Sequence, residues 1–148
     1  MRFYGFGNYY LSSLQQGLQS AHTVAELFIK YDQHSEQTNM VFDWAKDHKT
    51  MVLLNGGNSA NLAELHSSFE VLEAQGMNLP FAKFHEDEIS LNNALTYVGI
   101  VVPEKYYTIA SEIRQMRNVE VMEFFAFNSL EDWEKELIFI LNSYRLAN

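Results

Sequence analysis

The sequence contains no cysteine, and this absence excludes several kinds of site at once. Disulfide scaffolds, thiolate zinc sites, iron–sulfur clusters and cysteine nucleophiles all require that residue. Long apolar runs are missing too, since none approaches the roughly 18 to 20 residues that a membrane span needs. The opening stretch MRFYGFGNYY lacks the charged start and the uninterrupted apolar block of a secretory signal. We therefore expect a cytoplasmic protein that does not enter a membrane.

Positive charge is also scarce. Ten Lys and Arg stand against 19 Asp and Glu, which gives a formal net charge of −9 at pH 7. Proteins that bind nucleic acid take most of their affinity from Lys and Arg side chains that neutralise phosphates. No short cluster of Lys or Arg occurs along this chain, so we expect free nucleic acid to be a poor partner.

Apolar and aromatic side chains, in contrast, are plentiful. The chain is 47% hydrophobic and 14% aromatic, which is far above the content of a disordered protein. A domain of 148 residues buries about two-thirds of the surface that its unfolded chain exposes. We therefore expect one folded domain that needs neither a metal nor a disulfide for stability.

Hydrophobic periodicity and turn residues predict strands and helices in the order β α α β α β β α β α. Strands are expected at residues 2–6, 50–54, 79–84, 95–102 and 119–127. Helices are expected at residues 14–31, 40–45, 58–76, 104–117 and 129–144. Strands that alternate with helices indicate an α/β layer structure with a mixed sheet.

The one candidate boundary between parts of the chain falls near Pro103. No run of Pro, Gly or Ser marks a linker there, and no internal repeat or low-complexity segment occurs. Residues 1–103 are therefore expected to form a core. Residues 104–148 are expected to add a helix-strand-helix extension that packs on the same domain.

Capping residues mark the ends of several predicted helices. Ser12 and Ser13 both suit the N-cap of the first helix, and Asn58 suits that of the third. Gly76 suits the end of the third helix, because glycine adopts the left-handed conformation that commonly follows a helix. Ser129 begins a capping-box spacing before the last helix.

Two stripes of side chains run along the predicted first helix. The apolar stripe, whose spacing predicts the helix, consists of Leu14, Leu18, Ala21, Ala25 and Phe28. A polar stripe follows the same spacing on another side of the helix and consists of Gln15, Gln19, His22 and Glu26. Such a stripe is most often a solvated face. Two amides and an imidazole are nonetheless good hydrogen-bonding groups for a ligand site.

An acidic segment, residues 85–88 (HEDE), follows directly after a predicted strand, where α/β sheets usually bind ligands. Crowded carboxylates raise one another's pKa, and this can create a general base. The competing interpretation is an exposed acidic loop. Adjacent residues point in different directions, so the segment is a poor metal site, and we expect neither a metal nor a cofactor.

Residues 55–59 (NGGNS) join a strand to a helix, as phosphate-binding loops do. The segment lacks the Gly-Lys-Ser/Thr of nucleotide triphosphatases, and no Lys lies near it in the sequence. A structural turn is the preferred interpretation. No Gly-x-Ser-x-Gly motif occurs either, so serine-hydrolase chemistry has no support.

Two stretches together resemble the type II peptidyl-tRNA hydrolases. Residues 15–26 (QQGLQSAHTVAE) resemble the first helix of that family, in which a Gln is followed three residues later by a His. Residues 81–88 (FAKFHEDE) and 92–99 (NNALTYVG) resemble its acidic turn and its last strand, which carries a Thr. A branch of small bacterial and phage proteins shares this layout. The resemblance covers residues 1–103.

The resemblance implies a three-layer α/β/α fold, with a mixed sheet of four to five strands and helices on both faces. In the family, a Lys four residues before the Gln and an Asp after the third strand are linked to cleavage of the ester between peptide and tRNA. Gln19, His22 and Thr96 match family positions, and the role of the Asp falls on Asp87 or Glu86.

The position that matches the family Lys is occupied by Gln15. An amide cannot supply the positive charge that stabilises an ester oxyanion or anchors a phosphate. The sequence therefore favours a protein with this fold and a changed site, which binds a small, nucleotide-like ligand or a protein partner. A phage accessory protein would fit this description.

The alternative is an active hydrolase of peptidyl-tRNA or aminoacyl-tRNA esters. Asp87 or Glu86 would then act as the base for a water molecule that His22 orients, and Gln19 and Thr96 would polarise the carbonyl. The residues expected in catalysis are Asp87, His22 and Gln19, and those expected to hold a ligand are Gln15, Glu86, Thr96 and Asn92. A third interpretation is an interaction protein that forms a homodimer through residues 104–148. The sequence leaves open whether the protein is an enzyme, and both site hypotheses require the first helix to face the acidic segment.

Overall fold

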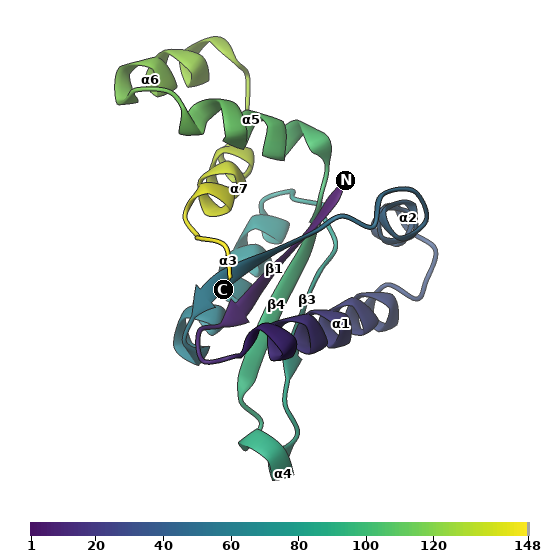
Figure 1. The fold of residues 1–148 in the computed structure, drawn as a ribbon. Helices are drawn as coiled ribbons and strands as arrows, with labels where there is room; N and C mark the ends of the chain where they lie inside the picture. The colour runs from purple at the N-terminus through teal and green to yellow at the C-terminus, as the bar shows by residue number, and fades with distance from the viewer. Residues whose placement is uncertain (148) are drawn as a thin grey trace.

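The computed structural model describes residues 1–147, and of Ser90 and Leu91 it describes only the backbone (Figure 1). The strands are β1 (Arg2–Asn8), β2 (Met51–Gly57), β3 (Phe81–His85) and β4 (Leu95–Val102). The helices are α1 (Ser13–Lys30), α2 (Glu36–Asp43), α3 (Ser59–Ala74), α4 (Glu88–Leu91), α5 (Glu104–Arg114), α6 (Asn118–Phe127) and α7 (Asp132–Asn142), and a π-helical turn, η1 (Trp44–His48), continues α2. None of the helices in the described residues has an apolar stretch long enough to cross a bilayer.

The four strands form one open sheet in the order β2-β1-β4-β3. β1 and β2 run parallel, and β4 runs antiparallel to both of its neighbours, β1 and β3. The predicted α/β class with a mixed sheet is thus confirmed, with four strands. All eight residues of β4 are buried, as expected for a central strand with a continuous apolar sequence.

Helices cover both faces of the sheet (Figure 1). Successive side chains of a strand point to opposite faces. Phe3 of β1 therefore packs with Leu27 of α1 and Trp44 of η1, whereas Phe6 packs with α3 through Phe69, their rings 6.1 Å apart. The side chains of α5 and α7 join the α3 side of the core. The molecule therefore has three layers.

The C-terminal part differs from the expected helix-strand-helix unit, because residues 119–127 lie in the helix α6 and not in a strand. The prediction of a strand was wrong because it rested on the Val and Phe content of this segment. A strand needs a sheet edge for its backbone groups, and the β2 edge is occupied by residues 145–147, which exchange hydrogen bonds with Leu53 and Asn55. In a helix, the backbone N–H and C=O groups form hydrogen bonds with one another and need no sheet edge.

The predicted caps of α1 and α3 are confirmed, and that of α7 is not. The helix expected at residues 40–45 begins earlier, at Glu36, and the one expected to end near Arg117 ends at Arg114. Ser12 caps α1, Asn58 caps α3, and Gly76 follows α3 with a φ of +116°, as expected. α7 begins at Asp132 with Glu131 as its N-cap, two residues later than the Ser129 cap indicated. The first turn of α7 is therefore fixed by acidic side chains and not by a serine.

α1 rests on the sheet through its polar side. The residues that it buries are Gln16, Gln19, Ser20, Thr23 and Leu27. The sheet beneath carries Gly7, where a Cβ would overlap the Gln16 amide, and Gly99, where a Cβ would lie 2.5 Å from the Phe3 ring and 3.0 Å from Thr23 Cγ2. The helix therefore approaches the strands closely, and small or flexible polar side chains fit this space better than leucines.

The apolar stripe of α1 faces solvent instead. Leu14 is 74% exposed and Leu18 is 51% exposed, and Ala21 and Ala25 are exposed beside them. Only Phe28 of the stripe is partly buried. An apolar stripe at helical spacing ordinarily faces the core. We call the four exposed residues the leucine stripe of α1, and packing within the chain does not explain them.

A buried carboxylate ties α5 to α7. Glu134 accepts hydrogen bonds from Lys105 Nζ at 3.0 Å, from the Tyr106 hydroxyl at 2.9 Å and from the Glu131 backbone N–H at 2.9 Å. Burial opposes ionisation of Glu134, but these three donors outweigh it and lower the pKa of its carboxyl below the ordinary value of 4.5. The folded chain therefore stabilises the ionised carboxylate of Glu134 more than the unfolded chain does.

Glu134→Gln is expected to lower the free energy of unfolding by about 1–3 kcal/mol at about pH 7, because charge-assisted hydrogen bonds are lost. A depressed carboxyl pKa stabilises the fold above the unfolded-state pKa, and this contribution disappears as pH falls through the folded-state pKa. The two proteins should therefore converge below about pH 4. Urea unfolding across this range measures the difference. Glu136→Gln, at an exposed position of α7, is the matched control, and an equal loss in both variants would contradict the assignment.

Candidate functional site

The carboxyl ends of β1, β2 and β3 meet the start of β4 at one end of the sheet, because β4 runs antiparallel to its neighbours. α1 and α3 begin at this end, and the segment with α4 projects beyond it (Figure 1). Polar side chains from several elements gather here. They are Asn8, Gln19, Ser59, Glu86 and Thr96, and we call them the polar end of the sheet.

Three of these side chains form a continuous chain of hydrogen bonds. Thr96 of β4 donates through Oγ1 to Gln19 Oε1 of α1 at 3.1 Å, and Gln19 Nε2 donates to Glu86 Oε1, just after β3. Thr96 is fully buried, Gln19 is almost fully buried and Glu86 is half-buried. The structure thus brings together the Gln of the first helix and the acidic segment, as both site hypotheses required.

His22 lies beside this chain. Its imidazole contacts the ring of Phe84 in β3, with ring centroids 4.6 Å apart, and the residue is exposed. The ring therefore sits on the surface next to the end of β3. Its position suits contact with a bound molecule, whereas its one described contact is apolar.

Gln15 has a different role from the one expected at the position of the family Lys. Its side-chain Oε1 accepts a hydrogen bond from the Ser12 backbone N–H at 2.9 Å, and its own N–H donates to Ser12 Oγ at 3.2 Å. This reciprocal pair is a capping box at the start of α1. The amide is thus held at the helix N-terminus.

Asp87 and Asn92 lie in the exposed connection between β3 and β4. The Glu86 N–H donates to the Ala94 carbonyl at 2.9 Å, and the Asn93 N–H donates to the Asp87 carbonyl at 3.3 Å, so the connection closes on itself. Asn92 and Asn93 adopt φ of 53° and 59°, a left-handed conformation that Asn tolerates well. Asp87 and Asn92 are both exposed, whereas Gln19 and Thr96 are buried.

Two further amides at this end, those of Asn8 and Gln16, were not expected from the sequence. Asn8 donates to Ser59 Oγ at 3.0 Å, and Gln16 Nε2 donates to the Asn8 carbonyl at 3.2 Å. The side-chain oxygens of both amides are buried and accept no hydrogen bond from the described residues, and the hydroxyl of Tyr97 is unpartnered there too. Burial raises the pKa of Tyr97, so this hydroxyl stays protonated. The only signal available was that Asn8 lies at the end of an aromatic-rich strand.

The polar end offers acceptors rather than positive charge. Glu86 contributes a half-buried carboxylate, and the unpartnered side-chain oxygens of Asn8 and Gln16 are buried from solvent. Within residues 1–147, no Lys or Arg donates a hydrogen bond to Gln19, Glu86 or Thr96. Such a surface suits a group that donates hydrogen bonds or carries positive charge, and it repels phosphate.

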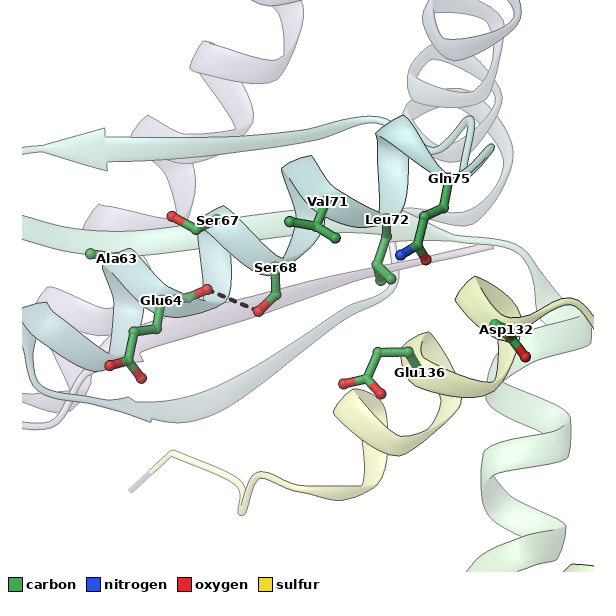
Figure 2. A pocket seen from close by; sticks show the side chains of 9 residues that line it. All are labelled: Ala63, Glu64, Ser67, Ser68, Val71, Leu72, Gln75, Asp132 and Glu136. Carbon is green, nitrogen blue, oxygen red and sulfur yellow. Dashed lines mark hydrogen bonds between the residues drawn. The ribbon is translucent and has the colours of Figure 1, made fainter.

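A groove on the other face of the sheet lies between α3 and α7. It has a volume of about 730 Å³ and is lined by Ala63, Glu64, Ser67, Ser68, Val71, Leu72, Gln75, Asp132 and Glu136 (Figure 2). A second cavity of about 510 Å³ shares Glu64, Ser68 and Glu136 with it and reaches residues 55–57 at the end of β2. We call the two together the α3–α7 groove. None of the site residues expected from the sequence lines it.

A metal site is not indicated at either place. The described residues contain no group of three or more His, Asp or Glu side chains placed to hold a metal ion.

The fold and the polar end define an α/β protein with a mixed four-stranded sheet and a hydrogen-bonded carboxylate where its strands end. No family model and no curated protein matches this sequence.

Proposed function

We propose that this protein is a binding protein, with a core like that of the type II peptidyl-tRNA hydrolases and a changed site, and that it recognises a protein partner through α1 and the polar end of the sheet. The observation that carries the proposal is the exposed leucine stripe of α1. Contiguous apolar surface on a folded protein, rimmed by polar groups, is typical of an interaction site.

The leucine stripe and the polar end form one continuous surface. With 3.6 residues per turn, His22 falls between Leu18 and Gln19 around the axis of α1. Moving around the helix, a partner would therefore meet the leucines, then the imidazole, and then the Glu86 carboxylate that Gln19 holds. Apolar contact at the centre and acceptors at the rim match the anatomy of protein interfaces.

Three features support binding over ester hydrolysis. Gln15 caps α1 and carries no charge, so the cation linked to catalysis in the family has no counterpart at that position. Gln19 already bonds Thr96 and Glu86 through both ends of its amide, so it cannot polarise a carbonyl without breaking that chain. The net charge of −9 also opposes the approach of tRNA.

To find the partner, the protein is immobilised and exposed to an extract of the cell that makes it. Each captured protein is then purified, and the Kd of its complex with this protein is measured. Leu14→Glu/Leu18→Glu is expected to weaken binding by at least about 100-fold, because it places charges at the apolar centre of the surface. Thr108→Glu/Gln115→Glu, at exposed positions in α5 and at its C-cap, adds the same charge and should leave the Kd unchanged. Equal Kd values for wild type and the leucine variant would refute the proposed surface.

The hydrolase alternative has one observation in its favour, since Glu86 Oε2 has no described partner and is free to accept a proton from water. Incubating labelled peptidyl-tRNA with wild type, Glu86→Gln and Asp87→Asn separates the two classes. We expect no release of peptide above the uncatalysed rate in any of them. Turnover by wild type that either variant abolishes would establish the hydrolase instead. Nucleotides should leave the Tm unchanged, because their phosphates would meet carboxylates at this end.

A further inference from the structure

We propose that the α3–α7 groove is a second binding site, which accepts a basic, amphipathic helix of a protein partner. The groove lies on the opposite face of the sheet from α1 (Figure 1), so it is a site separate from the leucine stripe.

The wall formed by α3 has room for another helix. Its groove side carries Ala63, Ser67, Ser68 and Val71, which are small for a helix surface, with Leu72 buried beneath them (Figure 2). Small side chains allow a neighbouring helix to approach within the 8–10 Å that is usual for packed helices. α7 stands on the far side and leaves this surface open.

The charged groups of the groove are all acidic. Glu64 projects from α3, and Asp132 and Glu136 project from α7 (Figure 2). These carboxylates accept no hydrogen bond and form no ion pair among residues 1–147, and no Lys or Arg lines the larger cavity. Each therefore remains available to a positive charge brought by another molecule.

The spacing of these carboxylates matches a helix. Asp132 and Glu136 are four residues apart, so they lie on the same side of α7, about 6 Å apart at Cβ. Lys or Arg side chains at positions i and i+4 of a helix lying along α7 would face both. Glu64 on the opposite wall would contact a third positive charge.

A helix fits this groove better than an extended segment does. The main cavity is walled by two helices, whose backbone groups are already hydrogen-bonded. An extended peptide would find no strand edge there to pair with, whereas a helix pairs its own backbone and needs only a side-chain surface. The apolar face of the helix would cover Ala63, Val71 and Leu72.

The probe for the test is a synthetic 16-residue helical peptide with Leu and Ala on one face and Lys at i, i+4 positions beside that face. Its Kd for the protein is measured by fluorescence anisotropy. Glu64→Lys/Glu136→Lys is expected to weaken its binding by at least about 30-fold. The control, Glu112→Lys/Glu123→Lys, makes the same change of charge at exposed positions of α5 and α6 and should change the Kd by less than about threefold. Ala63→Trp fills the groove without changing charge and should weaken binding by at least about tenfold.

Equal weakening by the two charge-reversal variants would show attraction to the acidic protein as a whole and would overturn the proposal. So would equal binding of a peptide with Glu in place of each Lys, or unchanged binding by Ala63→Trp. If the groove double variant does not fold, the Ala63→Trp result decides alone. The outcome is independent of the leucine stripe, because Leu14→Glu/Leu18→Glu should bind this peptide as wild type does.

Discussion

Phe69→Ala is expected to lower the free energy of unfolding by about 3–5 kcal/mol, because it removes a ring from the centre of the α3 side of the core. Phe69 has no exposed surface, and its ring lies 6.1 Å from that of Phe6 and 5.7 Å from that of Phe81. It therefore joins α3 to both β1 and β3. The cavity left behind has rigid strands on one side and can collapse only in part.

Urea unfolding measures this loss as a shift of the midpoint at constant m. Val71→Ala, on the exposed side of the same helix, is the matched control and should change the free energy of unfolding by less than about 0.5 kcal/mol. A loss below about 1 kcal/mol for Phe69→Ala would mean that α3 does not hold the sheet in the way described.

Leu137→Ala is expected to destabilise the whole molecule by about 2–5 kcal/mol, and not only the C-terminal helices. Leu137 of α7 has no exposed surface and belongs to the same apolar cluster as Phe6, Leu62 and Ile100. Loss of its side chain therefore weakens a core that residues 1–103 share with residues 104–147. Both parts should unfold in one transition.

The two tryptophans allow a direct measurement, because Trp44 lies on the α1 side of the sheet and Trp133 lies in α7. Trp133→Phe leaves Trp44, which reports on residues 1–103. Trp44→Phe leaves Trp133, which reports on residues 104–147. In both backgrounds Leu137→Ala should shift the fluorescence midpoint by the same amount. A shift confined to the Trp133 signal would show that α5–α7 unfold separately.

Much of the fold could be predicted from the sequence wherever local signals and tertiary structure agree. The apolar run of residues 95–102 predicted a central strand, and β4 has these bounds. Asn58 and Gly76 marked the ends of α3 because capping depends on nearby residues alone. The α6 segment was mistaken because its Val and Phe residues suit a strand, while the β2 edge of the sheet is already paired with residues 145–147.

The candidate sites, like the fold, could be predicted from the sequence only in part. The spacing of Gln19 in the first helix and the position of Glu86 after a strand allowed their approach to be expected, and the structure joins them through a hydrogen bond. Which side of α1 faces the sheet depends on Gly7 and Gly99 in two distant strands, so Leu14 and Leu18 could not be recognised as exposed. The α3–α7 groove depends on how far α7 stands from α3, which no local pattern records.

The antiparallel bridge between Leu54 and Leu146 has a consequence for the behaviour of the protein at high concentration. An open sheet has two edge strands with which strands of other molecules can pair, and such pairing leads to fibrous aggregates. Here residues 145–147 pair with the β2 edge at Leu53 and Asn55. Strand addition from another molecule is therefore confined to the edge formed by the short strand β3.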